Sequence, residues 1–94
     1  MAITNVTIKN FAYSPKDIEI QQGDKVVWTS EDAIEHTVTA DNGDFDSGDF
    51  TRDDPPFEHA FDTVTAPDQP IKYHCEHHGQ MKGTVKVVAA TPAK

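Results

Sequence analysis

The chain has 94 residues, of which 36% are hydrophobic and 26% charged, and its formal net charge is -8. This length allows one domain with a single hydrophobic core. The negative charge argues against nucleic acid or an anionic membrane surface as a partner. No apolar run approaches the roughly 20 residues that a membrane-spanning helix needs. We therefore expect one soluble, monomeric domain over residues 1–90, followed by a short flexible tail over residues 91–94.

Alternation of polar and apolar residues in the first half of the chain indicates short strands, some with one solvated face. The expected strands cover residues 3–8, 17–21, 25–29 and 36–39. Between them, the segment from Phe11 to Pro15 turns the chain, and Gln22-Gly23-Asp24 reads as a tight turn. Residues 30–35 are mostly polar and are expected to form a loop that leads to His36.

The second half begins with a segment over residues 41–56 that is rich in Asp, Gly, Ser and Pro, where regular structure is not expected. Apolar residues then alternate again, and the further strands are expected over residues 57–61, 71–75 and 84–88. No stretch resembles an amphipathic helix longer than a turn or two. Short strands separated by Gly, Pro and Asp turns predict an all-β domain, either a sandwich or a barrel, with seven to eight strands and at most one short helix.

A cluster of metal-binding residue types lies near the C-terminus. Cys75, His78 and Met81 follow one another at intervals of three, and Cys75 is the only cysteine. A thiolate, an imidazole and a thioether suit a soft or borderline transition metal and not calcium or magnesium. With His36 as a further ligand from upstream, the set predicts the coordination of an electron-transfer copper: two histidines, a cysteine and a weak axial methionine.

Each of these residues also has a simpler interpretation. Cys75 could be a buried free thiol, His36 a surface histidine, and Met81 core filling at the start of the last strand. If Met81 is not the axial ligand, Gln80 is the next candidate, and the backbone carbonyl of Glu35 could approach from the opposite side.

The other histidines are expected outside the site. His78 is preferred to His77 as a ligand because a residue directly after the strand end needs enough loop to turn back toward the metal. His74 should lie on the face opposite Cys75, in solvent. His59 shares an apolar face with neighbouring phenylalanines, so a core histidine with one hydrogen-bond partner is expected.

A run of acidic side chains follows the expected strand at residues 36–39. The simplest interpretation is a solvated loop, since the spacing lacks the regular oxygen ligands of an EF-hand calcium site. A docking surface for a basic redox partner is the alternative. The residues concerned are Asp41, Asp44, Asp46, Asp49, Asp53, Asp54 and Glu58.

Taken together, these motifs resemble those of the cupredoxins, the type 1 (blue) copper proteins, and specifically the plastocyanin, amicyanin and pseudoazurin group. The resemblance covers nearly the whole chain. It implies a two-sheet Greek-key β-sandwich with one copper ion per chain at one end, held by His36, Cys75 and His78 as equatorial ligands and Met81 as the axial ligand. The motifs that carry it are Phe11-Ala12-Tyr13-Ser14-Pro15, Gly23-Asp24-Lys25-Val26-Val27-Trp28, His36-Thr37-Val38, Phe45-Asp46-Ser47-Gly48, Phe61-Asp62, Tyr73-His74-Cys75 and Met81-Lys82-Gly83-Thr84-Val85.

Three positions depart from the family pattern. Thr37 stands where relatives usually carry an Asn that steadies the loop around the thiolate, so the threonine hydroxyl would have to do part of that work. Ser30 replaces another frequent Asn. His77 occupies a place where Pro is usual, which makes this loop more polar.

The resemblance implies a soluble one-electron carrier and not an enzyme. Electrons would pass through the exposed edge of His78, ringed by Ala33 and Ile34, to redox partner proteins such as a basic cytochrome or an oxidoreductase. Such a protein is expected in the periplasm, another extracytoplasmic space or the thylakoid lumen, although the chain starts without an export signal. A copper trafficking or storage protein is the alternative, disfavoured by the single cysteine, and a zinc hydrolase would need a general base that nothing in the sequence marks.

Overall fold

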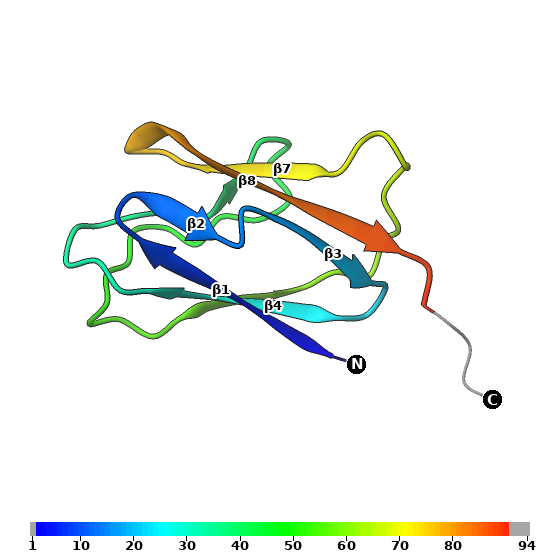
Figure 1. Ribbon diagram of the computed structural model, residues 1–94, viewed down its shortest axis with the longest axis horizontal. Helices are drawn as coiled ribbons and strands as arrows, with labels where there is room; N and C mark the ends of the chain where they lie inside the picture. The colour runs from blue at the N-terminus through cyan, green and yellow to red at the C-terminus, as the bar shows by residue number, and fades with distance from the viewer. Residues whose placement is uncertain (1, 91–94) are drawn as a thin grey trace.

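Two four-stranded sheets pack face to face in the computed structural model, which describes residues 2–90 (Figure 1). The first sheet has the order β2-β1-β4-β6, from Ala12–Ser14, Ile3–Lys9, Lys25–Ser30 and Phe57–Ala60. The second has the order β3-β8-β7-β5, from Asp17–Gln21, His78–Val88, Ile71–Cys75 and Thr39–Ala40.

The prediction of an all-β sandwich with seven to eight strands is confirmed, and residues 2–90 contain no helix. It follows that no helix in this part of the chain is long and apolar enough to cross a membrane. The predicted flexible tail over residues 91–94 lies outside the described residues.

Both sheets are mixed. β1 runs parallel to β4, and β3 runs parallel to β8, while the other neighbours are antiparallel. β3 follows β2 closely in the chain but belongs to the opposite sheet, so the chain crosses between the layers early. The β7–β8 hairpin and the β1–β2 turn lie at the same end of the sandwich in Figure 1, opposite the start of β1. This end is where the candidate ligands gather.

An aromatic core lies between the sheets. Trp28 is completely buried, and its ring lies 5.5 Å from that of Tyr73, 5.6 Å from that of Phe57 and 5.8 Å from that of Phe45. Alternation along β4, β6 and β7 places Trp28, Phe57 and Tyr73 inward, while Phe45 enters the core from the segment that follows β5. Offset and edge-to-face ring pairs at these distances stabilise a core beyond the area that they bury.

The acidic segment over residues 41–56 forms no strand, as predicted, but it is anchored to the rest of the fold. Phe45 and Phe50 are both buried, and Phe50 forms an isolated bridge with His36 through two backbone hydrogen bonds of 3.0 Å. The sequence did not indicate that these two phenylalanines are buried, because each one stands alone between polar residues in a segment whose composition is typical of turns. The segment therefore lies against the end of the sandwich that holds His36.

Three expectations about local structure were wrong. The segment expected to turn the chain at residues 11–15 contains β2, which pairs with β1. The expected strand at residues 36–39 has regular pairing only from Thr39, because His36 and its neighbours bond to the acidic segment instead. Finally, the last strand begins at His78 and not at Thr84, so the expected loop after Cys75 is only a two-residue turn.

A glycine makes the long last strand possible. A Cβ atom at Gly83 would lie 2.4 Å from the Tyr73 ring and 2.8 Å from the backbone oxygen of Lys16. No side chain fits there without moving a buried tyrosine and a backbone segment. β8 therefore passes over Tyr73 only because this position has no side chain.

Candidate metal centre

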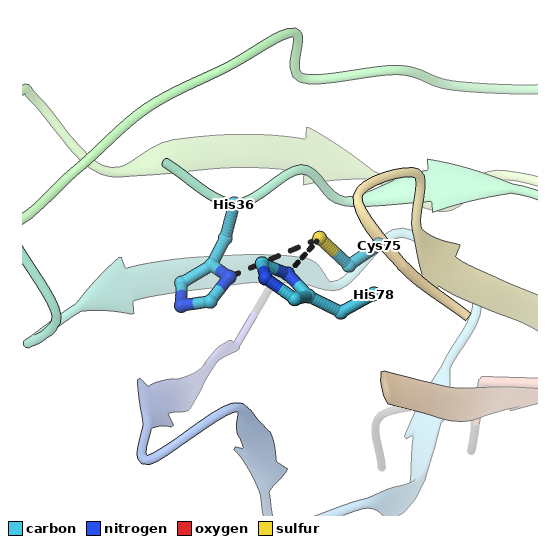
Figure 2. A group of neighbouring side chains, drawn as sticks. All are labelled: His36, Cys75 and His78. Atoms are coloured by element: carbon cyan, nitrogen blue, oxygen red, sulfur yellow. Dashed lines mark hydrogen bonds between the residues drawn. The ribbon is translucent and has the colours of Figure 1, made fainter. Parts of the chain in front are cut away.

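Three of the four predicted ligands come together at one end of the sandwich (Figure 2). His36 belongs to the connection between β4 and β5, Cys75 ends β7, and His78 begins β8. Their donor atoms all lie within 4.8 Å of one another. The Cys75 sulfur is 3.4 Å from Nδ1 of His78 and 3.8 Å from Nδ1 of His36, so the same nitrogen of each ring faces the sulfur.

The β7–β8 hairpin brings Cys75 and His78 together. The two residues are register partners across a turn formed by Glu76 and His77, and the register shifts between His74 and Cys75. A bulge of this kind re-aims the side chains at the end of a strand. The sequence had suggested that a loop turns His78 back toward the metal. In the structure, strand pairing brings His78 to the site instead.

His36 is completely buried and is held from behind by a carboxylate. Its Nε2 lies 2.8 Å from Oδ2 of Asp32. A carboxylate accepts the Nε2 proton, which leaves Nδ1 without a proton and able to bind a metal. Burial tends to raise the pKa of Asp32, but hydrogen bonds from His36 and from the backbone of Asn10 and Phe11 outweigh burial, and the pKa lies below its usual value. Asp32 is thus charged at neutral pH.

Thr37 supports the cysteine through both its backbone and its side chain. Its N–H donates to the Cys75 sulfur at 3.4 Å, and its hydroxyl accepts from the Glu76 N–H at 2.9 Å. Tyr13 donates to the Thr37 carbonyl at 2.6 Å, and burial raises the pKa of Tyr13 above its usual range, so the phenol stays a donor. The threonine hydroxyl therefore ties the two sides of the site together.

His78 is the partly exposed member of the group. One hollow beside it has a volume of about 350 Å³ and is lined by Phe11 and Met81, among others. A second hollow of about 430 Å³, also lined by His78, has Ala33, Ile34 and Glu35 in its wall. Phe11 and Ile34 are large apolar residues with about half of their surface exposed. The imidazole of His78 therefore reaches the surface between apolar side chains.

Met81 lies further along β8 and is 2% exposed. Both Met81 and Gln80, the other axial candidate from this strand, line the hollow beside His78, but Gln80 is exposed. The burial of Met81 also fits the simpler interpretation of a core side chain, so axial ligation by Met81 stays a prediction.

The remaining histidines lie outside this group. His74 is partly exposed and lies 2.6 Å from Asp41, while exposed His77 lies 2.6 Å from Asp49. Both pairs attach the acidic segment to the metal-site hairpin. His59 sits against Phe45 and Phe61, with ring centroids 4.9 Å away in each case, but it has no hydrogen-bond partner among residues 2–90, so the expected partner is missing.

Asp32 and Phe11 are the two residues at the site that sequence reasoning missed. Asp32 precedes His36 by four residues in a loop, where this spacing carries no signal. Phe11 is more than 20 positions away from Asp32 and from the three candidate ligands, and only the pairing of β1 with β2 and β4 brings it there.

Comparison with known proteins agrees with this geometry. Residues 2–88 match the family described as copper binding proteins, plastocyanin/azurin family. The chain therefore belongs to this family and is a cupredoxin. A soft sulfur and two imidazole nitrogens suit copper, and the cofactor is one copper ion per chain.

Several solved structures share the fold. The chain is 28% identical to a purple cupredoxin from Nitrosopumilus maritimus, with a TM-score of 0.74 over 89% of this chain and 98% of that chain. It is 21% identical to amicyanin from Paracoccus versutus, with a TM-score of 0.74 over 89% and 79%. An oxidized amicyanin mutant, also 21% identical, has a TM-score of 0.78 over 89% and 80%. A comparison with curated proteins finds no match.

Proposed function

We propose that this protein is a one-electron carrier with a type 1 copper centre, held by His36, Cys75 and His78 with Met81 as the axial ligand. The observation that carries the proposal is the depth of the site: Cys75 and His36 are completely buried, and only His78 reaches the surface. Ligands that are buried and held by their neighbours keep nearly the same positions in both oxidation states, which favours rapid electron transfer.

The bound copper would supply the redox chemistry, and the protein would supply the geometry. His36 is oriented by Asp32, and the Cys75 sulfur receives the Thr37 N–H. Binding would release the thiol proton of Cys75. The apolar surroundings of His78 would allow close approach of a partner protein, so that the electron leaves or enters through the imidazole edge.

A copper titration tests this proposal. Adding Cu(II) to the apo-protein should produce an intense band in the visible range from thiolate-to-copper charge transfer, and Cys75→Ser should abolish it. The full visible spectrum should be recorded, since a structural relative is called a purple cupredoxin. A protein that stays colourless with Cu(II), or a band that survives in Cys75→Ser, would contradict the proposal.

Copper trafficking or storage is the second candidate, and burial argues against it. A carrier that hands on its metal needs ligands that an acceptor can reach, whereas the sulfur and the first imidazole are inaccessible here. Exchange with a Cu(I) chelator separates the two functions. Release over hours supports electron transfer, and release within seconds supports trafficking.

We further propose that a positively charged redox protein docks around His78. Exposed Glu35 lines one of the hollows beside His78, and exposed Glu76 and Asp49 lie nearby on the hairpin and on the acidic segment paired with it. Opposite charges speed association, and salt screens the effect.

Stopped-flow reduction by a basic cytochrome at increasing ionic strength measures this steering. Glu35→Gln should slow association at low salt more than Asp68→Asn, which removes the same charge from the turn before β7, at the other end of the strand from Cys75. Rates that are independent of salt would contradict steering. Family membership also supports a monomer outside the cytoplasm, which sedimentation and cell fractionation would test.

A further inference from the structure

Asp32 is the meeting point of three hydrogen bonds at the metal end of the sandwich. Its Oδ1 accepts from the Asn10 N–H at 3.1 Å, and its Oδ2 lies 3.2 Å from the Phe11 N and 2.8 Å from Nε2 of His36. The side chain of Asp32 is 17% exposed, and the backbone N–H of Asp32 donates to the hydroxyl of Ser30 at 3.2 Å. One carboxylate thus joins the β1–β2 turn to the buried imidazole.

The turn that Asp32 holds has an unusual backbone. Asn10 has a φ of 53° and Phe11 a φ of 60°, so both residues are in the left-handed region. Asn tolerates this conformation, but the second position of such a hairpin turn normally carries Gly. A phenylalanine in this conformation is strained, and strain of this kind persists where the surroundings hold it in place. The two N–H bonds to Asp32 supply that hold.

The strained residue packs its ring against both histidines of the centre. The Phe11 ring centroid lies 5.5 Å from that of His36 at an interplanar angle of 88°, and 4.9 Å from that of His78 at 70°. These are edge-to-face contacts. They matter most for His78, whose only side-chain hydrogen-bond neighbour among residues 2–90 is Cys75. The Phe11 ring packs against that imidazole from 4.9 Å, and the only other ring as near is that of His36, at 5.1 Å, among residues 2–90.

We propose that Asp32 is a positioning residue for both imidazoles of the centre: for His36 by a direct hydrogen bond, and for His78 through the Asn10–Phe11 turn. This inference rests on the proposed function, because it takes both histidines as copper ligands. It goes further in linking the buried ligand and the exposed ligand through a residue that contacts only one of them.

Asp32→Asn is the main test. The amide keeps the size of the side chain but has one oxygen, whereas the three donors from Asn10, Phe11 and His36 now share two. The amide therefore cannot accept hydrogen bonds from the turn and from His36 together. The protein should still give the charge-transfer band, with Cu(I) affinity about 10- to 100-fold weaker. In the Cu(I) protein, the nuclear Overhauser effect between the Phe11 and His78 ring protons should weaken or vanish. An unchanged effect would overturn the proposal.

Phe11→Gly provides a test that does not depend on folding of the first variant, since Gly favours the left-handed conformation of this turn. If Phe11 were only structural, this change would leave the copper spectra and affinity unaltered. We expect weaker Cu(I) binding and an altered copper hyperfine splitting, while the midpoint of urea unfolding of the apo-protein is not lowered. Unaltered spectra and affinity would overturn the proposal.

A double variant and a control complete the design. In the Phe11→Gly background, Asp32→Asn should weaken Cu(I) binding by a smaller factor than in the wild type. Asp32 would then act only on His36, because its effect on His78 depends on the Phe11 ring. Phe11→Leu keeps apolar bulk without a ring and should fall between wild type and Phe11→Gly. If wild-type protein itself binds no copper, the proposed function fails; if wild type is coloured and all variants match it, only this inference fails.

Discussion

Two regions of this sandwich place a histidine among aromatic rings: His36 is completely buried, whereas His59 is half-buried. At the metal end, His36 packs edge-on against Phe11, and both of its nitrogens are engaged, one facing Asp32 and the other facing the Cys75 sulfur. His59 lines a hollow together with Phe45, Phe61 and Ile71, which we call the aromatic hollow. It lies against Phe45 and Phe61 with neither nitrogen hydrogen-bonded within residues 2–90.

The difference lies in the second layer of contacts. Around His36, the neighbouring polar groups are themselves bonded, as Thr37 is to Cys75, Glu76 and Tyr13. Around His59, the neighbours are hydrocarbon, with Asp44 and Asp62 at the rim of the hollow. A buried imidazole whose polar neighbours are all hydrogen-bonded marks a site built to bind, while a half-buried imidazole between apolar rings marks packing. Four measurements can break or sharpen this distinction.

The largest difference is expected between His36→Leu and His59→Leu. The first removes a candidate copper ligand, so the charge-transfer band should disappear, and copper affinity should fall by more than the roughly 100-fold that loss of a supporting residue costs. The second should keep the band and the affinity, because His59 is not part of the donor group. Copper titration followed by optical spectroscopy measures both. A band that survives in His36→Leu would remove the distinction altogether.

A smaller effect is expected from Thr37→Val, which keeps the shape of the side chain but removes its hydroxyl. The Glu76 N–H would lose its acceptor, and the hydroxyl of Thr39, now 2.9 Å from that of Thr37, would lose a partner. The apo-protein should lose about 1–3 kcal/mol of unfolding free energy in urea. Thr37→Ser keeps the hydroxyl and should recover most of it. Equal stability of the Val and Ser variants would show that the hydroxyl does not tie the site together.

The aromatic hollow predicts a dependence on pH. Burial lowers the pKa of His59, although Asp44 and Asp62 oppose the shift. The unfolded chain therefore takes up the proton first, at about pH 6.5. The folded state should keep its full stability above this pH and lose stability as the pH falls below it. Apo-protein carrying His59→Leu should lose less stability between pH 7 and pH 5 than wild type, in urea unfolding. A parallel loss in both proteins would assign the effect to other groups.

The smallest effect is expected at the rim of the sheet that carries His59. Lys25 and Glu58 lie 2.7 Å apart, with 28% and 49% of their side chains exposed. Exposed ion pairs stabilise little, so Glu58→Gln should cost less than about 1 kcal/mol of unfolding free energy, and added salt should reduce the difference further. A cost as large as that of Thr37→Val would mean that charge at this rim matters as much as the buried network.

Much of this fold could be read from the sequence because its strands carry clear alternation. The strands around Ile18, Trp28 and Tyr73 were expected within one or two residues of their observed bounds. The errors fell where pairing overrides local pattern. β2 is three residues long and exists because β1 lies beside it, and β8 starts at His78 because Cys75 is its register partner.

The identities of the candidate ligands followed from chemistry that is visible in the chain: one cysteine, a nearby histidine and methionine, and a second histidine upstream. Residue type decides which metals a donor can hold, so the sequence by itself determined the class of site and the alternating strands that frame it. The tertiary structure decided what lies behind the ligands. Asp32 reaches His36, and a strained Phe11 covers both imidazoles, because hydrogen bonds and ring contacts between distant segments depend on three-dimensional distance, which spacing along the chain does not encode.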